Sequence, residues 1–115
     1  MELDLSTRVE DGVTIVGVAG EVDIATAPEL DAVLAALPAG PAAVVVDLVD
    51  VGFLDSTGLG VLVKASARAR EHGGSFGLVV ANPSVDKVFR LTGLDAVIPL
   101  HASVAEAVGA VGGPA

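Results

Sequence analysis

The sequence predicts an α/β fold in which a mixed β-sheet, made of an N-terminal hairpin and parallel strands, packs with about four helices. The spacing of apolar residues alternates between the period of strands and that of helices. Residues 42–46 are apolar without alternation, as in a strand buried on both faces. A strand, a helix and a second strand in this order form a right-handed parallel unit.

The first half of the chain predicts a hairpin and a helix before that buried strand. Residues 3–9 alternate in polarity, residues 10–12 offer a turn, and a second strand follows over residues 13–19. Thr26 followed by Glu29 forms a capping-box pattern, which predicts the start of the helix.

The second half predicts alternating helices and strands. Asn82 followed by Pro83 is typical of a helix start, and Gly93 of a helix end. The predicted elements are a helix that follows residues 55–58 and runs to about His72, a strand over 76–80, a helix from Asn82 to Gly93, a short strand around 96–98, and a helix from Ser103. We expect one domain over residues 1–111 and a flexible C-terminal tail over residues 112–115.

Charge is unevenly distributed along the 115 residues. The net charge is −9; residues 1–55 carry −10 and residues 56–115 carry +1. Phosphate backbones and anionic membranes attract clusters of Lys and Arg, so we expect neither a nucleic-acid partner nor a membrane partner. The chain has no cysteine and shows no signal-peptide pattern, and we therefore expect a cytoplasmic protein.

The segment Phe53–Gly60 lies where the buried strand meets the longest helix. A helix start offers free N–H groups and partial positive charge, so a phosphate on a hydroxyl there would be tolerated. Gly58 and Gly60 remove side-chain bulk and would let another molecule approach. A structural interpretation stays open, because Asp, Ser and Thr are good N-caps and glycine eases packing at such junctions.

Three motifs in order give the chain a family resemblance. Asp55-Ser56-Thr57-Gly58-Leu59-Gly60 resembles the signature of the STAS domain family, specifically the bacterial anti-sigma factor antagonists. Gly20-Glu21-Val22-Asp23 precedes Thr26-Ala27-Pro28, and Phe89-Arg90-Leu91-Thr92-Gly93-Leu94 follows the fourth strand, as in that family. The resemblance covers roughly residues 5–110 and implies a STAS-like fold.

The resemblance implies a protein-level switch. In this family the unphosphorylated antagonist binds an anti-sigma factor that is also a serine kinase, and so frees a sigma factor. Phosphorylation of the serine after the motif aspartate, here Ser56, breaks the complex, and a serine phosphatase restores it. Thr57 is the neighbouring hydroxyl, which the family pattern does not favour.

The predicted topology extends the expected partner surface. Loops that leave the carboxyl ends of neighbouring parallel strands lie at the same edge of a sheet, so the segment after the second strand should adjoin Ser56. The expected partner-binding residues are Glu21, Asp23, Thr26, Asp55, Ser56, Thr57, Gly58, Leu59 and Gly60. Thr26 and the acids also have a structural interpretation as ordinary helix-start residues.

The same residues are compatible with two other functions. A STAS scaffold subunit of a signalling or lipid-transport complex, without a sigma-factor role, could carry the same motif. An enzyme with Ser56 as nucleophile would need a base within reach, and His72 and His101 stand in no triad motif, so we expect no enzyme. Neither histidine has an acid at metal-ligand spacing, and we expect no metal and no cofactor.

The remaining side chains predict ordinary structural roles. We expect the three phenylalanines to lie in the core: Phe53, Phe76 and Phe89. We expect a solvated helix face at Lys64, Arg68 and Arg70.

Overall fold

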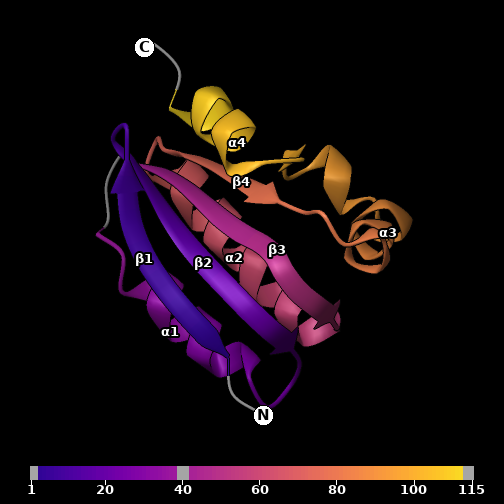
Figure 1. The fold of residues 1–115 in the computed structure, drawn as a ribbon. Helices are drawn as coiled ribbons and strands as arrows, with labels where there is room; N and C mark the ends of the chain where they lie inside the picture. The colour runs from indigo at the N-terminus through magenta and orange to yellow at the C-terminus, as the bar shows by residue number, and fades with distance from the viewer. Residues whose placement is uncertain (1–2, 39–41, 113–115) are drawn as a thin grey trace.

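Residues 3–38 and 42–112, the part of the chain that the computed structural model describes, form a five-stranded mixed sheet with helices on both faces (Figure 1). Strand order follows chain order, and only the first pair is antiparallel. The strands are β1 (Asp4–Glu10), β2 (Val13–Val22), β3 (Ala43–Leu54), β4 (Ser75–Val79) and β5 (Leu100–His101). The helices are α1 (Ala27–Ala35), α2 (Ser56–Glu71), α3 (Pro83–Thr92) and α4 (Val104–Val111), with a short 3₁₀ turn, η1 (Leu94–Ala96). The predicted fold class is confirmed.

The two faces of the sheet are covered unequally. Val46 and its β3 neighbour Val45 are both fully buried, but they belong to two different apolar clusters. The larger cluster joins the sheet to α1, α2 and α3; the smaller one joins Val13, Ile15 and Val45 to Ala107 of α4. Figure 1 shows α1 and α2 behind the strands and α4 near the hairpin end of the sheet. The opposite end of the α4-bearing face therefore has no helix over it among the described residues.

The end of α3 is as predicted, but the strand that follows is not. Asn82 caps α3 by accepting from Ser84 N at 2.8 Å, and Gly93 ends it in the left-handed conformation with φ of 75°. The strand predicted around residues 96–98 is wrong, because Gly93 leads straight into η1, where Ile98 N donates to Leu94 O at 2.8 Å. Of residues 96–98 only Ile98 is buried, and the strand forms two residues later as β5.

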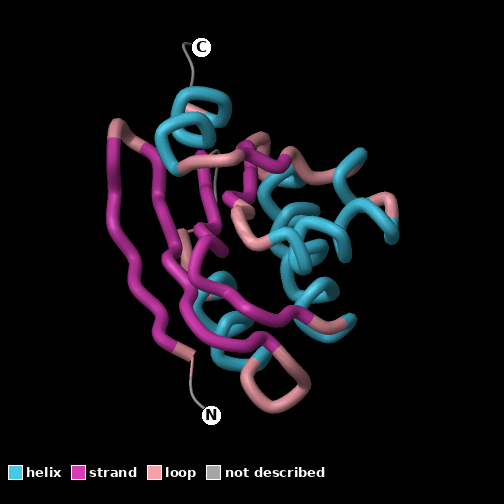
Figure 2. Tube along the Cα trace, turned by 45° about the vertical axis from the view of Figure 1, so that its right-hand side comes forward, coloured by secondary structure: helices cyan, strands magenta, loops and turns pink. Residues whose placement is uncertain are grey.

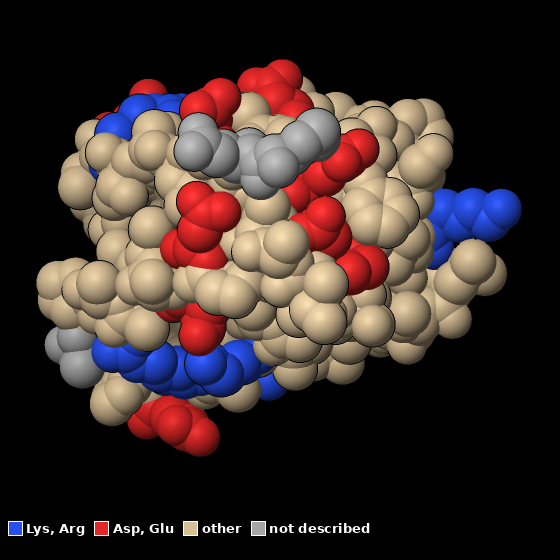
Figure 3. All heavy atoms as spheres, turned by 90° about the horizontal axis from the view of Figure 1, so that it is seen from below, with Lys and Arg blue, Asp and Glu red and all other residues tan. Residues whose placement is uncertain are grey.

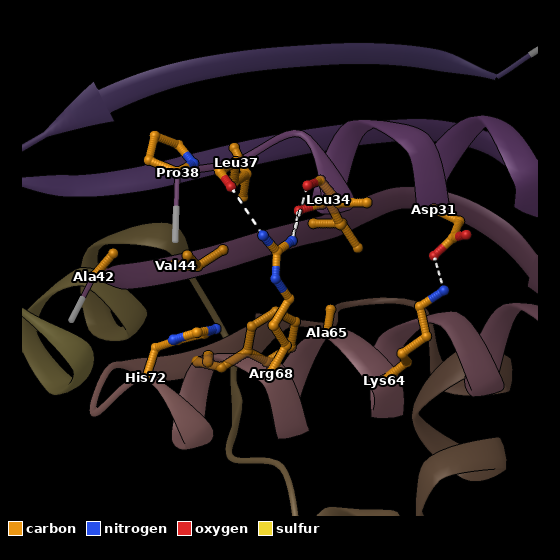
Figure 4. A pocket seen from close by; sticks show the side chains of 13 residues that line it. Asp31, Leu34, Leu37, Pro38, Ala42, Val44, Lys64, Ala65, Arg68 and His72 are labelled. Carbon is orange, nitrogen blue, oxygen red and sulfur yellow. Dashed lines mark hydrogen bonds and ion pairs between the residues drawn. The ribbon is translucent and has the colours of Figure 1, made fainter. Parts of the chain in front are cut away.

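Arg68 is not on a freely solvated face, contrary to the prediction. Its guanidinium donates to the carbonyls of Leu34 and Ala35 at 3.3 and 2.9 Å and to that of Leu37 at 3.4 Å (Figure 4). Since a helix end leaves carbonyls without partners, a cation from the next helix satisfies them. Together with an ion pair at 2.8 Å between Lys64 and an α1 carboxylate, Arg68 holds α2 against α1 beside a small pocket of about 70 Å³.

The predicted C-terminal tail at residues 112–115 falls mostly outside the described part of the chain, which ends at residue 112. Within residues 3–38 and 42–112, no helix is both long enough and apolar enough to cross a membrane.

Candidate functional site

The expected neighbourhood of two segments at one sheet edge is observed. Val22 and Leu54, the last residues of β2 and β3, pair in the parallel register. Directly beyond them, Asp55 N donates to Val22 O at 3.1 Å. Figure 2 shows the loop after β2 and the junction between β3 and α2 at the same end of the molecule. The start of α2 therefore lies beside the loop formed by residues 23–26.

Asp55 is the residue that starts α2. Its backbone is extended, and its carboxylate Oδ1 accepts from Thr57 N at 2.9 Å and Gly58 N at 3.1 Å. Two of the free N–H groups of the first turn are thus satisfied by one side chain. The helix begins at Ser56, earlier than predicted, and the exposed Ser56 and Thr57 are not needed as caps.

The glycines of the signature segment have different surroundings. A Cβ atom on Gly58 would lie 2.5 Å from Leu54 Cδ1 and 2.7 Å from Val22 Cγ1, so this glycine is required for packing inside the domain. Leu59 is also buried, at 8% exposure, within the main core. Gly60 is exposed, and a Cβ there would meet nothing within 4 Å. Of these three residues, only Gly60 borders solvent.

The loop after β2 is ordered by a hydrogen-bond network around Thr26, which is buried at 3% exposure. Its hydroxyl donates to Glu21 O at 2.7 Å and accepts from Asp23 N at 3.0 Å. The Asp23 carboxylate accepts from Ala25 N at 2.9 Å and Thr26 N at 3.0 Å. These hydrogen bonds lower the pKa of Asp23 below its ordinary value, and the bond from Thr26 N has the largest effect.

The capping box predicted for Thr26 and Glu29 is wrong. Thr26 does precede α1, but its side chain makes no bond to the first turn of the helix. The hydroxyl is turned back to the end of β2 instead, where it bonds Glu21 O. Thr26 and Asp23 therefore shape the loop from within, whereas Glu21 is exposed.

Phe53 is not a core residue, contrary to the prediction. Its exposed fraction is 49%, while Phe76 and Phe89 are buried as predicted. Side chains alternate along a strand, and the next residue, Leu54, points into the main core. Phe53 therefore points to the other face of the sheet, whose only helix, among the described residues, packs at the far end.

Acidic side chains gather on the end of the molecule that carries this edge. Figure 3, viewed onto that end, shows Asp and Glu spread among uncharged atoms, with Lys and Arg toward the margins. The register explains part of this, because Glu21 pairs with Phe53 and Asp50 pairs with Ala19. The concentration of acids in the first half of the sequence thus becomes an acidic face in space.

The histidines lie away from Ser56. His72 caps the far end of α2, and a helix of 16 residues separates the two by about 24 Å. His101 belongs to β5, where its Nε2 is buried without a hydrogen-bond partner among the described residues. The described residues also contain no group of three or more His, Asp or Glu that could hold a metal ion. Ser56 is thus an exposed hydroxyl, and both histidines lie on parts of the fold away from it.

Comparison with known proteins agrees with this arrangement. The family model described as the STAS domain matches residues 4–107. The chain belongs to the STAS domain family. The STAS chain is 32% identical over 102 residues to the anti-sigma-B factor antagonist of Bacillus subtilis, covering 89% of this chain and 94% of that protein. It is also 32% identical over 95 residues to the antagonist of the same name from Staphylococcus aureus, covering 82% and 88%.

A solved structure extends the likeness to the fold. The crystal structure of an anti-sigma factor antagonist from Mycobacterium paratuberculosis superimposes on the STAS chain with a TM-score of 0.85 at 34% identity. The match covers 95% of this chain and 93% of the other. These three relatives are all named anti-sigma factor or anti-sigma-B factor antagonists.

Sequence reasoning missed the exposed apolar side chains at the site. Ile24 is 76% exposed and Phe53 is 49% exposed. For Ile24 the signal was present, since a large apolar residue stands between Asp23 and Ala25 in a loop. For Phe53 it was absent, because an apolar residue at a strand end predicts burial unless the coverage of each sheet face is known.

Proposed function

We propose that the STAS chain is an anti-sigma factor antagonist: it binds an anti-sigma factor that is a serine kinase, releases a sigma factor, and is switched off by phosphorylation of Ser56. The single observation that supports this best is the exposed Ser56, in the first turn of α2 directly after the capping Asp55, on an acidic face. The 32% identity to an anti-sigma-B factor antagonist adds the class of partner. The domain that acts is residues 1–111, in the cytoplasm.

The switch would act through charge. A phosphate on Ser56 adds about −1.5 to −2 charges at pH 7. Because the Asp55 carboxylate already accepts from Thr57 N and Gly58 N, those groups are not free to bond the phosphate. The added charge would therefore stay at the surface beside a carboxylate. A partner that packs there would have to desolvate a dianion, and that cost can exceed the attraction of the phosphate to a cation across the contact.

The expected partner residues divide into two groups. Glu21, Ser56, Thr57 and Gly60 are exposed and can contact a partner. The others are buried or half-buried and act by positioning these four: Asp23, Thr26, Asp55, Gly58 and Leu59. Ser56 is the phosphate acceptor on the family pattern. Thr57 carries an adjacent exposed hydroxyl, so the modified residue has to be located.

The open surroundings of Gly60 also support a binding role. A glycine inside a helix costs about 0.5–1 kcal/mol relative to alanine. Nothing inside the domain requires it, since a Cβ at Gly60 would meet no atom within 4 Å. A partner surface lying directly on the α2 backbone would require it. The chain itself needs no cofactor for this function, because the kinase supplies the ATP, the metal and the base.

Phosphate mapping tests the proposal. The protein is incubated with its cognate anti-sigma factor and ATP, and the modified residue is located by mass spectrometry. We expect one phosphate at Ser56, none on Ser56→Ala, and its removal by the cognate serine phosphatase. Phosphate on Thr57 alone would reassign the acceptor. No phosphate on either residue would overturn the switch and favour a STAS scaffold without a sigma-factor role.

A further inference from the structure

Two large apolar side chains lie in solvent at the edge that carries Ser56. Ile24, in the loop after β2, is 76% exposed, and Phe53, near the end of β3, is 49% exposed. A single exposed apolar residue is normal on a protein surface. These two differ because they share one edge and because each stands on backbone that is fixed by strand pairing or by loop hydrogen bonds.

The backbone places both residues beside the start of α2. Phe53 pairs with Glu21 on the neighbouring strand, and Ile24 follows Glu21 by three residues. Ser56 follows Phe53 by three residues as well. The bond from Asp55 N to Val22 O, 3.1 Å long, ties the two segments together. Phe53 and Ile24 thus come from the two segments that meet at this edge.

Neither residue needs to be ordered by a partner. Phe53 lies within β3, with its backbone in the parallel register. Ile24 lies in the loop that the Thr26 hydroxyl closes through Glu21 O and Asp23 N, at 2.7 and 3.0 Å. Because the backbone is already fixed, binding through these side chains loses little conformational entropy. Large apolar side chains on a fixed backbone are suited to act as anchors in an interface.

The charges around the two residues indicate what kind of surface fits them. Glu21 and Asp50 are exposed near them, and Asp23 and Asp55 are half-buried on the same edge. Acidic side chains are spread over this end of the molecule, as Figure 3 shows. Interfaces commonly have an apolar centre and a polar rim, with charges that complement each other across the contact. The complement of this edge is an apolar hollow bordered by Lys and Arg.

We propose that Phe53 and Ile24 are the apolar anchors by which the chain docks on its anti-sigma factor, whose contacting face is an apolar hollow bordered by Lys and Arg. This rests on the function proposed above and adds to it the residues that carry affinity. The proposed contact also explains why phosphorylation would weaken binding. A phosphate on Ser56 would enter a contact that the two anchors otherwise keep free of water.

Binding measurements with matched variants test the anchors. The dissociation constant of the purified cognate anti-sigma factor is measured by calorimetry for the wild type, Phe53→Ser, Ile24→Ser and the double variant. Val9→Ser is the control, because Val9 is 68% exposed but lies at the opposite, hairpin end of the sheet. We expect about a tenfold loss of affinity for each anchor variant, a larger loss for the double variant, and a change below about twofold for the control.

The outcomes distinguish failure of the anchor proposal from failure of the proposed function. If the dissociation constants of both anchor variants lie within about twofold of the wild-type value while Ser56→Asp binds weakly, Phe53 and Ile24 are not anchors and the proposed function stands. If the wild type does not bind the anti-sigma factor, both are overturned. Affinity that does not fall as salt is raised would contradict the Lys and Arg border. Unfolding temperatures of the variants, expected to match that of the wild type for exposed positions, exclude a loss of fold as the cause.

Discussion

Gly58 packs directly on Val22: a Cβ atom placed on Gly58 would lie 2.7 Å from Val22 Cγ1. The backbone of the first turn of α2 therefore packs directly on the side chains of Val22 and Leu54, at the ends of β2 and β3. This contact fixes where Ser56 stands relative to the loop after β2. The position of the proposed switch thus depends on Gly58, a residue buried inside the domain.

Gly58→Ala is expected to destabilise the domain. The new methyl group would have to displace Val22 and Leu54, both buried, and overpacking of this kind costs about 1–3 kcal/mol. Urea unfolding of the variant and the wild type measures the difference in the free energy of unfolding. Equal stability would show that the start of α2 can shift without cost and that its position is not fixed by this contact.

Gly60→Ala is expected to have opposite effects on stability and binding. Alanine favours a helix interior over glycine, and the site is open, so the free energy of unfolding should rise by about 0.5–1 kcal/mol. If a partner lies on the α2 backbone, the same methyl group weakens binding of the anti-sigma factor at least about tenfold. Urea unfolding and calorimetric titration measure the two effects. A more stable variant that binds as tightly as the wild type would remove Gly60 from the interface.

Arg68→Met is expected to loosen the contact between α1 and α2. The variant keeps an apolar stem but loses the bonds to the carbonyls of Leu34, Ala35 and Leu37, at a cost of about 1–2 kcal/mol. Arg68→Lys keeps a cation but lacks the several N–H donors of the guanidinium group, so it should recover part of the lost free energy of unfolding. Thermal and urea unfolding check both variants. A stability unchanged in Arg68→Met would mean that water satisfies the α1 carbonyls equally well.

The loop after β2 is expected to contribute stability that depends on pH. The pKa of Asp23 is lowered in the folded state, chiefly by the N–H of Thr26, so ionised Asp23 favours the fold above the ordinary aspartate pKa of 3.8. That contribution is lost as the pH falls through the lowered folded-state pKa. Asp23→Ala should therefore be less stable than the wild type near neutral pH, and the gap should narrow in acid. A gap independent of pH would mean that the carboxylate charge does not hold the loop.

Most elements, and the meeting of the loop after β2 with the start of α2, could be predicted from the sequence, because they depend on local patterns and on the parallel crossover. Asn82 and Gly93 bound α3 as expected, and the parallel crossover brings Glu21 and Ser56 to one edge. The predictions that were wrong concern residues whose surroundings depend on the rest of the structure. Phe53 is exposed because α4 covers only the far end of its face, and the Thr26 hydroxyl bonds Glu21 O rather than the helix that it precedes.

The same limit explains the contrast between the two glycines. Gly58 and Gly60 are two residues apart in one motif, and nothing in the motif separates a glycine needed for packing from one that leaves a surface open. The difference comes from helix geometry, because Gly58 faces Val22 and Leu54 while Gly60 faces solvent. Only the placement of α2 on the sheet reveals it.

A switch at Ser56 requires the anti-sigma factor to bind the phosphorylated and unphosphorylated forms with different affinities. The protein is phosphorylated by its cognate kinase, the single phosphate at Ser56 is verified, and the dissociation constant is measured for both forms under identical salt. We predict that the phosphorylated form binds at least about tenfold more weakly than the unphosphorylated form. Equal affinity of the two forms would contradict a switch at Ser56.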